Sequence, residues 1–165
     1  MVIIVFGLPG SGKSYFASRL AKQLGAVYVN SDELRMKLLA ERTYTDAEKL
    51  FVYDAMFESM TDAIQEKRAI VLDATFYKQS IRTKFEQAAD AAGEQIIYIE
   101  VTASEELIKE RVSRPRKVSE ADYGVYLKLK EAAEPLVQDH LILQSTNSDV
   151  SPMIEKAIQY INSKI

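Results

Sequence analysis

A glycine-rich turn near the start constrains this chain more than any other stretch. Residues 7–14 read GLPGSGKS and directly follow the apolar run at 2–6. They match G-x-x-x-x-G-K-[ST], a pattern found where a buried strand turns into a helix. The glycines let several backbone N–H groups face inward, and the helix that follows adds the positive end of its macrodipole. The sequence therefore predicts a phosphate-binding loop.

Two side chains of this loop have an expected role toward a bound triphosphate. Lys13 is placed to reach the β- and γ-phosphates, and the Ser14 hydroxyl is placed to bind Mg²⁺. The other contacts are expected from the turn and its backbone amides. The predicted nucleotide-binding residues here are Gly7, Pro9, Gly10, Ser11, Gly12, Lys13, Ser14 and Tyr15.

Length and composition favour one domain over residues 1–165. The 165 residues are 47% hydrophobic, enough to bury one sizeable core and short for two. No basic segment precedes the first apolar run, and no stretch of about 18 consecutive apolar residues is present. We therefore expect a cytoplasmic protein with neither a secretory signal nor a membrane span.

Charge and residue usage narrow the kinds of site. The chain has no cysteine and one histidine, which excludes disulfides and disfavours Cys- or His-based metal centres. Any metal is expected to be Mg²⁺ on oxygen ligands. The net charge of −3 argues against binding along duplex nucleic acid, which needs a basic face. The charge does not exclude a small site that binds only the end of a nucleic acid.

Hydrophobic periodicity predicts strands that alternate with helices. Short apolar runs typical of buried strands lie at 2–6, 26–29, 69–73, 95–101 and 140–143. Helical spacing is found at 13–24, 34–40, 46–67, 80–92, 105–114, 122–133 and 153–161. This alternation implies an α/β fold, with a parallel sheet covered by helices on both faces and a site at the carboxyl ends of the strands.

Two features are expected to be structural. The helix at 46–67 carries an apolar stripe that should face the core: Leu50, Tyr53, Phe57, Met60 and Ile64. His140 opens an apolar strand, and a structural role is favoured there over a catalytic one.

Charged residues follow two of the predicted strands. Asp32 comes after the second strand, where it is either a general base beside the γ-phosphate or an acid that complements a helix dipole. Arg35 shares its helical face and either holds an anionic acceptor or pairs with Asp32. Asp73 ends the third strand, where it either holds Mg²⁺ through water or has a structural role.

A charged break interrupts the later helices at Pro115. Arg111, Arg114 and Arg116 flank it and either close over the phosphates as a lid, at about 113–121, or form a solvated helix end. Residues 116–120 are expected to be mobile, with Lys117 solvated. The polar loop Ser145, Thr146 and Asn147 follows the fifth strand and is a candidate rim for an adenine base.

Three classes of nucleotide-using protein can be compared with this pattern. A GTP switch would carry Asn-Lys-x-Asp, whereas the nearest stretch, at 147–149, lacks the lysine. A mechanical ATPase places a glutamate after the acid of its third strand, whereas Ala74 follows Asp73 here. A phosphotransferase needs a base, cations and a lid, and candidates for all three are present. The alternative is an ATP-binding switch that acts through a partner, which has no need of the Asp32 and Arg35 pair.

The stretches GLPGSGKSYFA, VNSDELR, VLDATF and RVSRPRKVSEADYGVY together resemble small P-loop kinases grouped around the polynucleotide 5′-kinase domain, zeta-toxin-like proteins and chloramphenicol phosphotransferase. The resemblance covers nearly the whole chain. It implies a nucleotide-kinase fold with a five-stranded sheet ordered 2-3-1-4-5. It also implies that Asp32 is the general base, that Arg35 binds the acceptor, and that Lys13 and Ser14 bind ATP and Mg²⁺. Arg114 and Arg116 would engage the ATP phosphates.

The chain departs from this group in two ways. Tyr15 stands where such kinases usually have a small residue, and there is no accompanying phosphatase or ligase domain. The resemblance therefore leaves the acceptor open among a small molecule, a nucleoside and a nucleic-acid 5′ end, with the acidic composition favouring a small acceptor. The oligomeric state also stays open.

Overall fold

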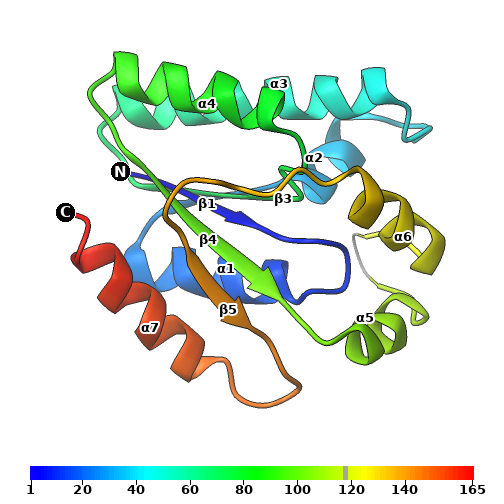
Figure 1. The fold of residues 1–165 in the computed structure, drawn as a ribbon. Helices are drawn as coiled ribbons and strands as arrows, with labels where there is room; N and C mark the ends of the chain where they lie inside the picture. Colours follow the sequence, from blue (N-terminus) through cyan, green and yellow to red (C-terminus); the bar gives the residue numbers. More distant parts are fainter. Residues whose placement is uncertain (117–118) are drawn as a thin grey trace.

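Five parallel strands form the centre of the computed structural model, which describes residues 1–116 and 119–165. Strand β1 (Val2–Phe6) lies in the middle, and the order is β2-β3-β1-β4-β5 (Figure 1). The other four strands are β2 (Val27–Asn30), β3 (Ile70–Ala74), β4 (Ile96–Thr102) and β5 (Leu141–Gln144). The structure confirms the predicted strand order.

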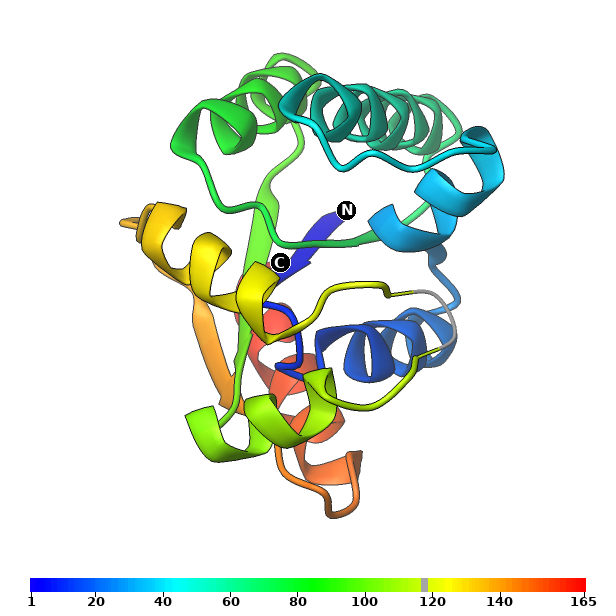
Figure 2. The same ribbon diagram turned by 90° about the vertical axis from the view of Figure 1, so that its right-hand side faces the viewer.

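Helices cover both faces of the sheet. Helices α1 (Lys13–Leu24) and α7 (Ser151–Asn162) lie on one face, and α3 (Asp46–Gln65) and α4 (Gln79–Ala91) lie on the other (Figure 1). Three shorter helices gather at the carboxyl ends of the strands: α2 (Ser31–Leu38), α5 (Glu105–Val112) and α6 (Tyr123–Ala132) (Figure 2). No helix in the described part of the chain is both long and apolar enough to span a membrane.

Strand β1 shows why a continuous apolar run is needed at the centre. Ile4 and Phe6 pack into the core beneath α3 and α4, while Ile3 and Val5 pack into the core beside α1 and α7. Successive side chains of a strand point to opposite faces, so a strand buried on both sides must be apolar at every position.

The register brings the predicted site to one edge. Asn30 at the end of β2 is aligned with Asp73 near the end of β3, and Phe6 at the end of β1 is aligned with Ala74. The phosphate loop after β1 and the turn into α2 therefore leave the same edge of the sheet, on either side of the end of β3.

The stripe predicted on α3 is partly wrong. Tyr53 and Met60 are buried, but Leu50 is 55% exposed, and Val52 and Met56 face the core instead. Residues two apart on a helix point to nearly opposite sides, so a core face that contains Val52 turns Leu50 toward solvent.

Candidate active site

The phosphate loop needs glycine at two positions for different reasons. A side chain at Gly7 would bring its Cβ within 2.3 Å of the Val101 carbonyl oxygen, and the φ angle of Gly7 is +154°. Gly12 is the N-cap of α1 with a φ angle of +89°, a left-handed conformation that disfavours residues with a Cβ. The loop thus packs its backbone directly on β4 and starts α1 with amides exposed toward the edge of the sheet.

Two side chains from later in the chain hold this loop from behind. Arg111 of α5 donates from Nη1 to the Gly10 carbonyl at 3.1 Å and to Ser145 Oγ at 2.8 Å. Ser145 in turn donates to the Ser11 carbonyl. Burial lowers the pKa of Arg111. The carbonyls of Gly10 and Ser11 are therefore both hydrogen-bonded by side chains from distant parts of the chain.

Arg111 and Ser145 therefore have a supporting role that the sequence did not indicate. The Arg111 guanidinium also donates to the Thr146 carbonyl at 2.9 Å, so Arg111 is not a solvated helix end, and it lines the cavity in front of the loop. Ser145 is 6% exposed and supports the loop, although it also lines the cavity in front of it.

A cavity of about 870 Å³ opens in front of the loop. Of the predicted nucleotide-binding residues, its lining includes Gly10, Gly12, Lys13, Ser14, Tyr15, Arg114 and Arg116, together with residues 142–150. The other three predicted residues lie elsewhere. Gly7 packs on Val101, Ser11 is buried, and Pro9 lines a second cavity. We call the first the donor cavity.

Tyr15 lies at the rim of the donor cavity. Its side chain is 57% exposed, and the Arg19 guanidinium lies 3.3 Å from the centre of its ring. The large side chain thus points outward against its own helix, where its ring packs on Arg19.

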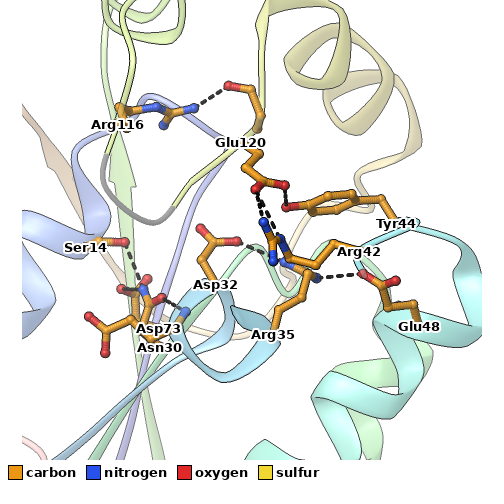
Figure 3. Close-up of polar contacts among 12 residues, drawn as sticks. Ser14, Asn30, Asp32, Arg35, Arg42, Tyr44, Glu48, Asp73, Arg116 and Glu120 are labelled. Atoms are coloured by element: carbon orange, nitrogen blue, oxygen red, sulfur yellow. Dashed lines mark hydrogen bonds and ion pairs between the residues drawn. The ribbon is translucent and has the colours of Figure 1, made fainter. Parts of the chain in front are cut away.

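A buried polar cluster fits the Mg²⁺ site predicted from Ser14 and Asp73 (Figure 3). Asp73 is fully buried, and its Oδ2 accepts from Asn30 Nδ2 at 2.6 Å and from the Tyr28 hydroxyl at 2.8 Å. Asn30 Nδ2 also donates to Ser14 Oγ at 3.2 Å. Burial, followed by the charge of Asp73, raises the pKa of Tyr28 and keeps it a donor.

The surroundings of the second carboxylate oxygen of Asp73 test whether the cluster fits Mg²⁺. Asp73 Oδ1 is buried and has no hydrogen-bond partner among the described residues. An unpaired buried carboxylate oxygen is costly, so a water or a hydrated cation beside it would satisfy it. The oxygen donor set of Asp73 and Ser14 suits Mg²⁺, which keeps several of its waters.

Asp32 and Arg35 pair across one turn of α2. Arg35 Nη1 donates to Asp32 Oδ1 at 2.9 Å, and Arg35 is 8% exposed. Arg35 Nε lies 3.3 Å from Glu48 Oε1, close enough for an ion pair but without hydrogen-bond geometry. Burial opposes ionisation of Glu48, but hydrogen bonds from the amide and hydroxyl of Thr43 outweigh it and lower its pKa. Within the described chain, Asp32 Oδ2 accepts no hydrogen bond and stays available.

Asn30 fixes the start of this helix. Its side-chain oxygen accepts from the Glu33 amide at 2.9 Å, which makes it the N-cap of α2, while its Nδ2 binds Asp73. One side chain therefore caps the helix that carries Asp32 and orders the cation cluster.

The predicted lid arginines have different surroundings. Arg114 pairs with Glu110 at 2.6 Å and its side chain is 71% exposed, as expected of a solvated helix end. Arg116 donates to the Ala121 carbonyl, and burial lowers its pKa while the charge of Asp32 acts against this. Of the predicted lid, residues 117 and 118, and with them the expectation for Lys117, lie outside the described residues.

A contact that the sequence did not indicate joins the loop after α2 to the segment before α6 (Figure 3). Glu120 accepts from Arg42 Nη2 at 2.6 Å and from the Tyr44 hydroxyl at 2.5 Å. These bonds, that of Arg42 first, lower the pKa of Glu120 to about 2. We call Arg42, Tyr44 and Glu120 the Glu120 latch.

A second cavity of about 610 Å³ lies between α2, α3, α6 and the end of β3. Lys13, Asp32 and Ser119 line both this cavity and the donor cavity. Arg35, Tyr44 and Glu120 line only the second one, which we call the acceptor cavity. The two cavities therefore meet at the phosphate-loop lysine and the carboxylate of α2.

The profile of the family described as "AAA domain" matches residues 2–136. The chain belongs to the AAA domain family. No curated protein sequence matches it.

Solved structures similar to this AAA domain protein include small kinases. A gluconokinase from Sinorhizobium meliloti 1021 superposes with a TM-score of 0.72 at 19% identity, over 96% of this chain and 89% of the other. The Mycobacterium tuberculosis APS kinase CysC, in complex with AMPPNP and APS, gives 0.72 at 17% identity, over 98% and 96%. Chaetomium thermophilum Kti12, in complex with ADP-AlF3, gives 0.71 at 19% identity, over 96% and 98%. At these identities the likeness shows the fold, which is that of P-loop kinases.

Sequence reasoning missed several residues at the site of this AAA domain protein. Asn30 is marked in the sequence only as a helix cap, and its contact with Asp73, like the position of Glu48 beside Arg35, arises only from the fold. The lone histidine is structural, as expected, since His140 contacts the Gln138 carbonyl at 2.7 Å and Glu100 at 3.2 Å.

Proposed function

We propose that this AAA domain protein transfers the γ-phosphoryl group of ATP to a hydroxyl group of an acceptor. The observation that carries the proposal is the junction of two cavities at Lys13 and Asp32. A phosphoryl transfer needs donor and acceptor in line at one point, whereas hydrolysis needs room for water alone.

Each residue at the junction has a role in this proposal. The loop amides and Lys13 hold the β- and γ-phosphates, and Arg116 adds positive charge beside them. Asp32 Oδ2 takes the proton of the acceptor hydroxyl. The acceptor oxygen bonds to the γ-phosphorus while the bond between that phosphorus and the bridging oxygen breaks, which releases ADP. Arg35 holds the carboxylate of Asp32 in place through Oδ1.

Asp73 and Ser14 would hold Mg²⁺ when ATP is bound. The ion would supply positive charge that offsets the negative charge of the transferred group. Asn30 and Tyr28 keep Asp73 oriented for this, because both donate to its other oxygen.

The test is acceptor-dependent turnover of Mg·ATP against neutral alcohols, sugars, nucleosides and oligonucleotides with a 5′-hydroxyl. The wild-type protein is compared with Asp32→Asn and with Asp54→Asn, an exposed carboxylate on α3 that pairs with Lys84 outside the site. Stimulated turnover that is lost only in Asp32→Asn supports the proposal. Tight ATP binding without stimulation by any acceptor would contradict it and favour a switch that acts through a partner.

A further inference from the structure

The acceptor cavity contains three lysines that the proposed transfer does not use. Lys49 comes from α3, Lys78 stands at the N-cap of α4, and Lys128 comes from α6. Their side chains therefore approach one cavity from three helices. Among the described residues none of the three has an ion-pair partner, whereas Lys84, Lys130 and Lys164 each pair with a carboxylate on the surface.

The carboxylates of the cavity do not balance this charge. Asp32 is paired with Arg35, and Glu120 is paired with Arg42 in the Glu120 latch. Asp46 is exposed, at the first turn of α3, and is the remaining acid of the lining. The wall that carries the three lysines thus has an excess of positive charge, which attracts anions more strongly in a partly enclosed cavity than on an open surface.

Two of these lysines converge on one aromatic ring. Lys49 Nζ lies 5.6 Å and Lys78 Nζ lies 5.5 Å from the centre of the Tyr77 ring, and Tyr77 is 8% exposed. The ring stabilises both cations weakly and lies between the two helix segments that carry them. Two ammonium groups that line one cavity without carboxylate partners repel each other, and an anion bound in the cavity relieves this repulsion.

The position of Lys78 at the start of α4 also favours an anion in the acceptor cavity. A positive side chain at the start of a helix is opposed by the helix macrodipole, and Lys78 makes no capping hydrogen bond there. Lys78 therefore contributes little to the stability of α4. Its charge and the start of the helix both favour an anion in the cavity.

The rest of the lining fits the body of a small organic molecule. Val52, Tyr53 and Leu129 give the cavity apolar surface, and Tyr44 adds an aromatic edge. A volume of about 610 Å³ is in the range of sites for molecules of nucleotide size or smaller.

We infer that the acceptor is a small hydroxy compound with an anionic group, a phosphate or a carboxylate, and that Lys49, Lys78 and Lys128 bind this group while Asp32 faces the hydroxyl. This inference rests on the proposed function for the identity of the reaction. The anion site itself can be tested without turnover.

The binding experiment uses protein saturated with Mg·AMPPNP, so that the phosphate loop is occupied. Glucose, gluconate and glucose 6-phosphate share a carbon chain and differ in charge, and adenosine and 5′-AMP form a second pair. Calorimetry measures their affinities for the wild type, Lys49→Gln/Lys78→Gln, Lys128→Gln and the matched control Lys84→Gln. We expect an anionic member of a pair to bind at least about tenfold more tightly than the neutral one, and each cavity variant to remove most of this preference.

The outcomes separate the two proposals. Preference for glucose 6-phosphate or 5′-AMP identifies a phosphate, and preference for gluconate identifies a carboxylate. Equal binding of neutral and anionic probes, or an anion preference that survives in both cavity variants, overturns the inference. The same probes are then tested for turnover with Mg·ATP in place of Mg·AMPPNP. Anion binding that depends on these lysines, without phosphorylation of any probe, supports the anion site and contradicts the proposed transfer. Phosphorylation of neutral acceptors that is unaffected in the lysine variants supports the proposed transfer and contradicts the anion site.

Discussion

The guanidinium of Arg35 donates to Asp32 at 2.9 Å across one turn of α2. A base held in this way keeps one oxygen in the pair and the other free, so its direction is fixed before an acceptor binds. Because Arg35 also lies 3.3 Å from Glu48, it keeps a partner when Asp32 is neutralised.

Asp32→Asn should therefore abolish transfer without loosening the fold. We expect kcat to fall by about 10²- to 10⁴-fold, the usual contribution of a general base, while the dissociation constant of ATP changes little. Steady-state kinetics and calorimetry measure the two quantities, with Asp54→Asn as the control. An equal loss in ATP binding and turnover would contradict the assignment of Asp32.

Lys13→Ala should lower the rate of ATP turnover at the donor cavity. Loss of a cation that contacts the transferred group typically costs about 10²- to 10³-fold in rate. Lys22→Ala, an exposed lysine in the last turn of the same helix, is the control. A Lys13→Ala protein with full turnover would show that the donor site lies elsewhere.

Asn30→Asp should destabilise the protein. The new carboxylate would lie where Asn30 now donates to Asp73 at 2.6 Å, so two buried acids would face each other. Breaking a buried charged contact in this way costs about 3 kcal/mol of unfolding free energy. Urea denaturation measures the change, and Asn162→Asp at the exposed end of α7 is the matched control. Unchanged stability with Asn30→Asp would mean that Asp73 is not held by this amide.

Arg111→Ala should reduce ATP affinity, because Arg111 supports the phosphate loop as well as lining the donor cavity. Its guanidinium holds the Gly10 carbonyl and Ser145, so its loss should let the loop shift. We expect the affinity for ATP to fall by about 10- to 100-fold. Arg111→Lys keeps the charge but cannot make these contacts together, and should restore little. Arg68→Ala, on the surface beside Glu66, is the control. Full recovery with lysine would show that Arg111 acts through charge alone.

The Glu120 latch should make stability depend on pH in the acid range. Hydrogen bonds from Arg42 and Tyr44 lower the folded-state pKa of Glu120 to about 2 from an ordinary 4.5. A carboxyl with a depressed pKa stabilises the fold above its unfolded-state pKa, and this contribution is lost as pH falls. The difference in unfolding free energy between wild type and Glu120→Gln should hold above pH 5 and decline toward pH 2. A difference independent of pH would show that the charge of Glu120 does not matter.

The fold was predictable because its signals are local. The apolar run of β1 and the GLPGSGKS turn define the first unit, and each later strand is a short apolar run followed by polar residues. Leu50 shows the limit, since its spacing fits the predicted stripe but only the position of α3 on the sheet decides which face is buried.

Within the candidate site, the phosphate loop, Asp32, Arg35 and Asp73 carry a local signal in their position after strands. Arg111 does not, because its partners Gly10 and Ser145 lie 101 and 34 residues away. Glu120 likewise finds Arg42 only through the fold. Contacts between distant segments leave no pattern in the sequence around either partner.

The support behind the phosphate loop has a consequence for how this protein acquires activity. The loop lies between residues 7 and 14, yet the groups that hold its carbonyls come from α5 and from the turn after β5. During synthesis residues 7–14 are made well before Ser145, so the contacts that support the loop form only after residue 145 is present. Refolding should therefore give secondary structure first and ATP binding last, with the second event limited by the formation of contacts that are distant in sequence.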